Sequence, residues 1–261
     1  MSAYLRYIVP ALLGISTLVL WEVWVDYAEV SPLVLASPSE IWTSFVENFP
    51  VLMHALWFTV KITVFSFIAA TIGGIGLAII FSQSRITEYA LYPYAVVLQV
   101  TPVVAIAPLL VIWIGYDHIT TVLVVLAWII SFFTILSNTT TGLKSADHNL
   151  VDLFKLYGAS RWQVLWRLQL PSALPYLLAA MKISGGLALI GAVTAEFVAG
   201  SGNDQGLGWT ITLAGRANDT AMEFAALSLL SLLGIAILFA MTAIEWALLH
   251  RWHESAVKKQ D

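Results

Sequence analysis

The chain has 261 residues, of which 59% are hydrophobic and only 11% are charged, and its mean hydropathy is +0.85. Because soluble domains carry about 25% charged residues, this composition excludes an ordinary soluble protein and indicates one that crosses a membrane several times. The formal net charge of −4 argues against a nucleic-acid partner, and the absence of cysteine excludes disulfides and thiolate metal sites.

Six segments of the chain are long and apolar enough to be membrane-spanning helices, which need about 20 mostly apolar residues. The segment nearest the N-terminus lacks the small-residue cleavage site of a signal peptide, so we interpret it as a retained span. The sequence therefore predicts an all-α polytopic membrane protein that forms a single transmembrane domain over residues 1–261. The predicted spans cover residues 7–27, 56–81, 89–114, 119–138, 175–199 and 224–250.

Lys and Arg residues are distributed unevenly between the two sides of the predicted membrane. Cytoplasmic loops are enriched in these residues, so we assign the richer side, with both termini, to the cytoplasm. The loops of the opposite side hold a single such cation, Arg216, and several acidic residues. The predicted cytoplasmic cations are Arg6, Arg85, Lys144, Lys155, Arg161, Arg167, Arg251, Lys258 and Lys259, with Lys182 near the same side.

Two segments on the predicted outer side have recognisable patterns. Residues 31–46 indicate a turn followed by a short interfacial helix, with Ser37 or Ser39 as its N-cap. The glycine-rich residues 200–209 lack the preceding strand and the Lys-Ser/Thr pair of a phosphate-binding loop. We therefore interpret them as a flexible loop.

Small residues spaced by four line faces of the second and fifth predicted spans. Such faces let the backbones of two helices approach closely in lipid. The pattern does not distinguish packing within the bundle from an interface between subunits. The residues are Ala69 with Gly73, Ala70 with Gly74 and Ala78, Ser184 with Ala188 and Ala192, and Gly191 with Ala195 and Ala199.

Residues 145–171 form a polar, basic stretch between the fourth and fifth spans. Asp147 is predicted to be the N-cap of a first short helix, and Gly158 fits the left-handed position that ends a helix at low steric cost. One face of this helix is apolar, and the other carries Asn149, Asp152 and Lys155. The apolar face consists of Leu150, Leu153, Phe154 and Tyr157.

A second short helix is predicted after the glycine. Ser160 and Gln163 make a capping box at its start, and Pro171 and Pro175 are expected to break it before the fifth span. Its apolar stripe consists of Trp162, Leu165 and Trp166. The two helices either lie on lipid or dock into a groove of a soluble protein.

The spacing in this stretch resembles a signature of bacterial importer permeases of the ATP-binding-cassette class. The signature is Glu-Ala-Ala, three residues, Gly, nine residues, Ile, one residue and Leu-Pro. Asp replaces Glu, Leu-Phe replaces Ala-Ala, and Leu replaces Ile, which keeps the sign of the charge and the hydrophobic character. The matching residues, at the same spacing throughout, are Asp152-Leu153-Phe154, Gly158, Leu168 and Leu170-Pro171.

Three further patterns resemble one branch of that class, the permeases for nitrate, taurine, aliphatic sulfonates and related solutes. Together with the signature, they extend the resemblance over nearly the whole chain. They are Ser-Pro-Ser-Glu-Ile-Trp at 37–42, Thr-Pro-Val-Val-Ala-Ile-Ala-Pro-Leu at 101–109 with Trp-Ile-Gly at 113–115, and Ala-Glu-Phe at 195–197 with Gly-Leu-Gly at 206–208.

The resemblance implies a six-helix permease of the bacterial inner membrane that works as a homodimer. Two separate ATPase subunits would bind ATP and Mg, because this chain has no phosphate-binding loop. A periplasmic or lipid-anchored binding protein would deliver a small polar solute, either anionic or heteroaromatic, such as a sulfonate or a thiamine pyrimidine precursor. The implied ATPase-coupling residues are Asp152, Phe154, Tyr157, Gly158, Ala159, Leu168, Leu170 and Pro171.

Two charged residues lie inside predicted spans, where an ionisable side chain is costly and marks a candidate functional site. Lys61 either extends to the outer headgroups or lines the translocation path, where it would suit an anionic substrate. Glu196 is either a hydrogen-bonded group at a helix end or, as the resemblance implies, part of a gate or a binding-protein contact.

The third span contains three prolines, Pro93, Pro102 and Pro108, which are expected to break it. Backbone groups freed by proline must be satisfied by neighbours or by a water-lined cavity. We therefore predict that this span lines the path, with Gln99 and Thr101 as its polar groups.

Nothing in the sequence indicates catalysis or a metal site. His250, His253 and Glu254 lie within one helical turn, but they follow a basic membrane exit and are interpreted as part of a solvated tail. The protein is therefore predicted not to be an enzyme. The alternatives to an importer are a membrane scaffold and an ion-driven transporter, although the latter usually has more spans or an inverted repeat.

Overall fold

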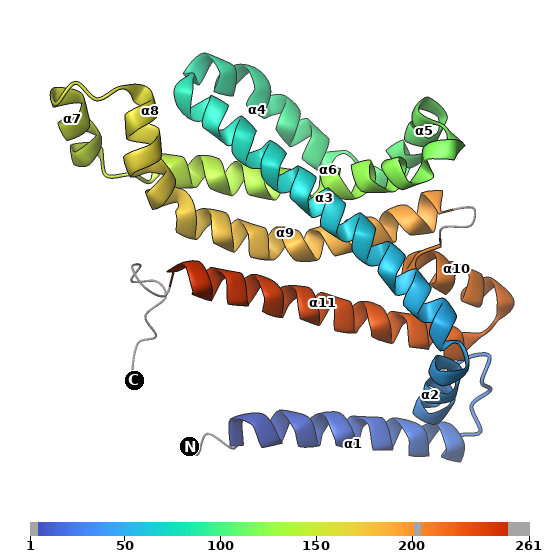
Figure 1. Cartoon of the computed structure of the whole chain (residues 1–261). Helices are drawn as coiled ribbons and strands as arrows, with labels where there is room; N and C mark the ends of the chain where they lie inside the picture. Colours follow the sequence, from blue (N-terminus) through green and yellow to red (C-terminus); the bar gives the residue numbers. More distant parts are fainter. Residues whose placement is uncertain (1–4, 201–204, 250–261) are drawn as a thin grey trace.

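The computed structural model describes residues 5–200 and 205–249, and the regular structure of this part of the chain is helical (Figure 1). Its elements are α1 (Leu5–Tyr27), α2 (Pro38–Glu47), α3 (Phe49–Gln83), α4 (Arg85–Val100), α5 (Val103–Ile114), the 3-10 turn η1 (Tyr116–His118), α6 (Ile119–Lys144), α7 (His148–Leu156), α8 (Arg161–Val164), the π-helical turn η2 (Leu165–Gln169), α9 (Leu170–Ala199), α10 (Leu207–Ala217) and α11 (Thr220–Leu249).

Helices α3, α6 and α9 pack against one another and form the core of the bundle (Figure 1). Glycines permit their close approach, since packing between apolar helices in lipid depends on backbone proximity. A Cβ atom at Gly74 of α3 would lie 2.9 Å from Ile135 of α6, and one at Gly191 of α9 would lie 2.8 Å from Ala127 of α6. Neither site can accept a larger residue without separating the helices.

Most of the small residues spaced by four in the sequence serve this internal packing. The side chains of Ala70, Ala78, Ser184, Ala188 and Ala192 are buried within the chain. The Ser184 hydroxyl of α9 also donates a hydrogen bond to the carbonyl of Ser131 in α6, at 3.1 Å. Packing within the bundle, one of the two interpretations of these residues, is therefore confirmed for this set.

Five helices in the described part of the chain are long and apolar enough to cross a membrane, and α4 with α5 makes a sixth span if the pair is counted as one. The prediction that three prolines break this span is only partly correct. The two helices meet at 102° across Thr101 and Pro102. Thr101 is extended, as a residue before proline prefers, whereas Pro93 and Pro108 lie inside α4 and α5.

The predicted break before the fifth span is wrong. Helices α8, η2 and α9 run as one helix over Arg161–Ala199, and Pro175 lies inside it. In the π-helical turn, Leu170 donates its N–H to the carbonyl of Leu165, five residues back. This wider turn accommodates Pro171, which has no N–H and whose ring crowds the preceding turn of an ordinary α-helix.

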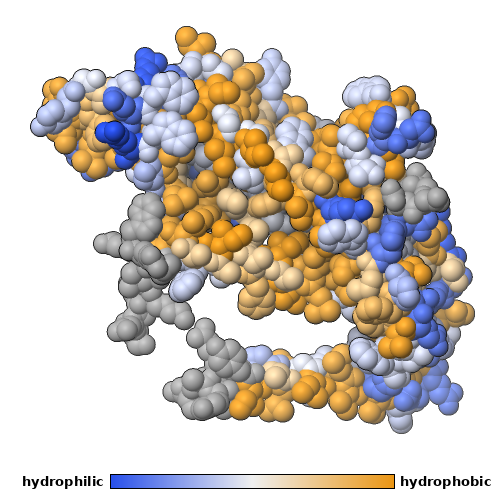
Figure 2. Space-filling view, viewed as in Figure 1, coloured by the Kyte–Doolittle hydropathy of each residue, from blue (hydrophilic) through white to orange (hydrophobic). Residues whose placement is uncertain are grey.

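Helix α1 stands apart from the core; it contacts α2, and its Trp21 ring packs edge-on against Phe224 of α11 (Figure 1). Ser39 of α2 donates its backbone N–H at 3.0 Å and its hydroxyl at 2.7 Å to the carboxylate of Glu22 in α1. The predicted N-cap of α2 is confirmed as Ser37, with Glu40 completing a capping box. The side of α1 seen in Figure 2 is a nearly continuous apolar surface.

Candidate functional site

The first predicted helix of the 145–171 stretch is α7, and its ends form as the sequence indicates. The side chain of Asp147 accepts a hydrogen bond from the Asn149 N–H at 2.8 Å. At the other end, Gly158 has a φ of +71°. Its N–H donates to the Lys155 carbonyl and the Ala159 N–H donates to the Phe154 carbonyl, both at 2.9 Å. This is the paired pattern that satisfies the last carbonyls of a helix.

The second helix begins three residues later with the predicted capping box. The Ser160 hydroxyl accepts from the Gln163 N–H at 3.3 Å, and the Gln163 side chain accepts from the Ser160 N–H at 2.7 Å. The predicted apolar stripe divides in two, because Leu165 is fully buried while Trp162 and Trp166 are exposed. The turn around Gly158 thus joins two helices that are each capped by their own local residues.

The residues implied in ATPase coupling fall into two groups. Tyr157 and Gly158 stand at the exposed tip between α7 and α8, where Leu156 and Tyr157 are 85% and 83% exposed. Leu168, Leu170 and Pro171 are half-buried in the continuous helix below. A groove of about 420 Å³ beside the tip is lined by Leu153, Phe154, Tyr157, Gly158, Ala159, Gln163 and Arg167.

Asp152, at the start of the signature, is exposed and forms an ion pair with Lys155 at 2.8 Å. The hydrogen bond from Lys155 and the positive charge of its ammonium hold the pKa of Asp152 below its usual range. Asp152 is therefore negatively charged at neutral pH, and it presents that charge on the surface of α7.

Glu196 lies near the end of α9, and its side chain is only 1% exposed. The Thr59 hydroxyl of α3 donates to Glu196 Oε1 at 2.8 Å, and the Gly208 N–H of α10 donates to Oε2 at 2.7 Å. The Leu207 N–H in turn donates to the Thr59 Oγ1 at 2.9 Å. The first N–H groups of a helix lack partners within it, so Glu196 and Thr59 together cap α10 from two other helices.

The Gly-Leu-Gly pattern fits around this carboxylate. A Cβ atom on Gly206 would collide with the Glu196 carboxylate, and one on Gly208 would lie 2.9 Å from Oε2. The prediction of a loop over 200–209 is wrong for its last residues, because α10 begins at Leu207. Residues 201–204 of that predicted loop lie outside the described residues.

The other residues predicted to line a path do not reach Glu196. Lys61 is exposed, with its ammonium 5.7 Å from the centre of the Phe58 ring. Gln99 is exposed, and the Thr101 hydroxyl donates to the Val97 carbonyl at 2.7 Å. Thr101 and Pro102 lie at the bend between α4 and α5. Their roles in a path, and that of Glu196, stay predictions.

Sequence reasoning missed two polar contacts within the spans. The sequence did not mark Thr59 as a site residue, because the hydroxyl of a threonine in an apolar helix commonly donates a hydrogen bond to a carbonyl of the same helix. Its partner Glu196 is also distant in sequence. Lys182 and Glu245 form an ion pair at 3.2 Å that joins α9 to α11. Within residues 5–200 and 205–249 no cluster of potential metal ligands is found. His250, His253 and Glu254 lie outside the described residues.

Similar proteins include two named permeases. The formylaminopyrimidine transport permease protein ThiX of Halalkalibacterium halodurans is 33% identical over 245 residues, covering 92% of this chain and 94% of that protein. The riboflavin transport system permease protein RibX of Chloroflexus aurantiacus is 39% identical over 171 residues, covering 66% of this chain and 62% of that protein.

A solved structure with a similar fold is that of the MetNI methionine ABC transporter in an inward facing conformation. Its TM-score to this chain is 0.68 at 18% identity, and the match covers 78% of this chain and 98% of that chain. At this identity the likeness concerns the fold alone.

The family model of the binding-protein-dependent transport system inner membrane component matches residues 70–254. This match and the nearly full-length relative support the importer interpretation of the sequence and not the ion-driven alternative. The chain therefore belongs to the family of binding-protein-dependent transport inner membrane components, as a membrane-spanning permease subunit of an ATP-driven importer.

Proposed function

We propose that the turn around Gly158, within the 145–171 stretch, is the element through which separate ATPase subunits drive this permease. The observation that carries the proposal is that both helices are capped locally while the tip between them is exposed. Such a tip, with Tyr157 at its end and a groove beside it, suits insertion into a cleft of a partner. ATP and Mg would bind to the partner, and the working unit would contain two copies of this chain and two ATPase subunits.

The permease would lie in a bacterial inner membrane with both termini in the cytoplasm. The distribution of cations supports this orientation. Arg85 and Arg161 lie with the 145–171 stretch at one end of the bundle, whereas α10, which carries Arg216, lies at the other end (Figure 1). Because cytoplasmic surfaces are richer in Lys and Arg, the end with Gly158 would face the ATPase. The outer end, with α2 and α10, would face a solute-binding protein.

The solute would be a small polar molecule, heteroaromatic or anionic. The names of the two relatives described above, permeases for formylaminopyrimidine and riboflavin, support a heteroaromatic solute, whereas relatives of lower identity named for aliphatic sulfonates and taurine support an anionic one. The path would pass the bend at Thr101 and Pro102, with Gln99 as a further polar group. Lys61 would favour an anionic solute, and Glu196 would shape the outer end of the path by holding α10 in place.

Replacement of Gly158 by valine tests the coupling role. A β-branched residue is strained at a φ of +71°, so the turn must change shape. We expect wild-type permease with a C-terminal tag to retain one ATPase per permease, and Gly158→Val to lose the ATPase while its amount in the membrane is unchanged. Gly76→Val is the matched control, because no atom lies within 4 Å of a Cβ atom at Gly76.

A permease that purifies alone while its ATPase is present in the same cells would contradict the coupling role. The solute class is tested separately by titrating the purified binding protein with formylaminopyrimidine, riboflavin, taurine and nitrate. Binding of one of the first two is the expected result. Binding of taurine or nitrate, with no affinity for either heteroaromatic compound, would overturn the heteroaromatic assignment without affecting the coupling experiment.

A further inference from the structure

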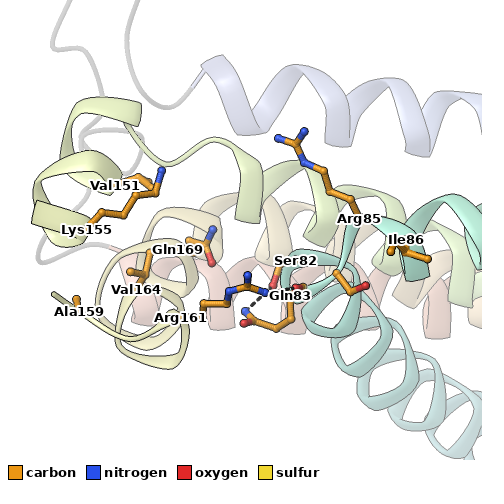
Figure 3. Close-up of a pocket in the computed structure, with 11 residues that line it drawn as sticks. Ser82, Gln83, Arg85, Ile86, Val151, Lys155, Ala159, Arg161, Val164 and Gln169 are labelled. Carbon is orange, nitrogen blue, oxygen red and sulfur yellow. Dashed lines mark hydrogen bonds between the residues drawn. The ribbon is translucent and has the colours of Figure 1, made fainter.

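A polar groove opens where the α3–α4 corner faces α7 and α8 (Figure 3). Its volume is about 600 Å³, and an adjoining lobe of about 630 Å³ shares Arg85 and Lys155 with it. Figure 3 shows the side chains of Lys155 and Arg85 extending from opposite sides toward the space between them. The first lobe is lined by Gln83 and Arg85 of the α3–α4 corner and by Lys155, Ala159 and Arg161 of the 145–171 stretch, among others.

One of the cations fixes the two sides of the groove to each other. Arg161 donates a hydrogen bond from Nη1 to the carbonyl of Gln83, the last residue of α3, at 3.2 Å. The last carbonyls of a helix lack partners within it, and a positive charge there interacts favourably with the helix dipole. This contact uses one of the five N–H donors of the guanidinium. The two sides of the groove are therefore joined by this contact, and the guanidinium keeps further N–H donors for a ligand.

The charges in the groove do not cancel. Lys144, in the second lobe, pairs with Glu88, and Lys155 pairs with Asp152. Within the described part of the chain, Arg85 and Arg161 have no carboxylate within ion-pair distance. Two guanidinium groups thus face a cavity with an excess of positive charge. Guanidinium forks bind phosphate oxygens in pairs, so the arrangement favours a phosphate-bearing ligand.

The groove lies where lipid headgroups would lie. Arg85 follows directly on the apolar helix α3 and begins α4, whose next turn carries Tyr89. Tyr89 is 74% exposed, and on α8 and η2 the Trp162 and Trp166 rings are also exposed. Exposed Tyr and Trp rings at the ends of spanning helices mark the membrane interface. Basic pockets between spanning helices at that level bind anionic headgroups.

We propose that this groove binds the headgroup of an anionic phospholipid, with Arg85 as the principal phosphate ligand and Arg161 as the second. The lipid would then bridge the α3–α4 corner and the base of the 145–171 stretch. Leu156, Tyr157 and Gly158 line neither lobe, so the end of the tip stays clear, whereas Ala159 borders the first lobe. Binding of the lipid does not depend on the proposed ATPase, so it can be tested on the permease alone.

The experiment is a lipid titration of the full-length permease in detergent, with bound lipids counted by native mass spectrometry. The probes are phosphatidylglycerol and phosphatidylcholine. We expect wild-type protein to prefer phosphatidylglycerol, and Arg85→Gln to weaken this binding by about tenfold or more, because the variant loses a charged hydrogen bond to the phosphate. Arg216→Gln removes the same charge at the far end of the bundle and is the matched control.

Two further measurements keep the result decisive. Arg85→Lys retains the charge without the planar fork and should bind phosphatidylglycerol more weakly than wild-type but more tightly than Arg85→Gln. Inorganic phosphate, added at millimolar concentration, should not displace the lipid. Equal binding by wild-type and Arg85→Gln, or equal loss in Arg216→Gln, would overturn the proposal. Displacement by phosphate, or by the co-purified ATPase, would assign the groove to a free anion or to a protein contact instead.

Discussion

At the scale of single residues, Glu196 has the most informative position. A carboxylate removed from water is costly unless its oxygens are hydrogen-bonded. Here the cost is offset by the Thr59 hydroxyl and by the N–H groups at the start of α10. The residue therefore joins α3, α9 and α10 at a single point. The interpretation of Glu196 as a hydrogen-bonded group at a helix end describes these contacts.

Truncation of Glu196 should loosen the outer end of the bundle. Glu196→Ala leaves the Thr59 hydroxyl and the Gly208 N–H without their acceptors. Each buried donor left unpaired costs about 1–3 kcal/mol. We expect a clear decrease in the thermal unfolding temperature of the permease. Tryptophan fluorescence of the protein in detergent measures this temperature. Glu196→Gln should lie between wild-type and Glu196→Ala, because the amide keeps one acceptor but turns an NH₂ group toward a donor.

Glu47→Gln is the control for this pair, since Glu47 is exposed at the end of α2. Its unfolding temperature should equal that of the wild-type. If Glu196→Ala unfolded at the same temperature as Glu47→Gln, the carboxylate would not be what holds α10.

Contacts between residues that are close in sequence could be predicted, and contacts between distant residues could not. The caps at Asp147 and at Ser160 with Gln163 follow local spacing, and the structure confirms them. The bond between Thr59 and Glu196 joins residues 137 positions apart. No periodicity or spacing encodes such a contact, because it depends on how three helices pack. The local structure at Gly158 was therefore predicted in detail, whereas Glu196 was predicted, as one of two alternatives, to be a hydrogen-bonded group at a helix end, without its partners.

At the scale of elements, hydrophobic length predicted the spans but not their continuity. Proline was expected to interrupt helices at several places. It does so at Pro102, where α4 ends and α5 begins, but Pro171 is absorbed by a π-helical turn. Whether a proline breaks or bends a helix depends on whether the helix can widen locally and whether neighbours support both arms. Neither condition can be read from sequence.

Helix α10 allows a comparison of two glycines within one element. A Cβ atom at Gly208 would lie 2.9 Å from both Glu196 Oε2 and the Val193 carbonyl, whereas one at Gly215 would lie 3.7 Å from its nearest neighbour. Gly208→Ala should therefore lower the unfolding temperature by displacing the start of α10. Gly215→Ala should leave it unchanged or raise it, since alanine favours a helix over glycine by about 1 kcal/mol. Equal effects would show that the start of α10 is not closely packed against Glu196.

At the scale of the whole molecule, the helices differ in the fraction of their residues that the rest of the chain buries. In the most apolar window of α6, 50% of the residues are buried within the chain, compared with 17% in α11 and 6% in α1. Helix α6 is thus the centre of the bundle, and α1 and α11 present their apolar surfaces outward. Lipid covers such surfaces in part, and the proposed second copy of the chain would cover more.

The proposed homodimer can be tested by light scattering of the purified permease, with the contribution of detergent subtracted. The expected polypeptide mass is twice 28.6 kDa. It should stay constant over a tenfold dilution, because an obligate interface does not dissociate in that range. A mass of a single chain in both detergent and lipid nanodiscs would contradict the homodimer.

The continuous helix over Arg161–Ala199 has a mechanical consequence. Its 39 residues, at 1.5 Å each, span roughly 58 Å. The residues that follow the Gly158 turn and the Glu196 carboxylate that caps α10 therefore belong to one continuous helix. Under the proposed coupling role, a displacement at Arg161 would pass along this helix toward Glu196, with the π-helical turn and Pro175 as the sites where the helix bends most readily. Under the same proposal, the cap of α10 would be the part of the outer surface that this helix moves directly, since Glu196 bonds to the first residues of α10.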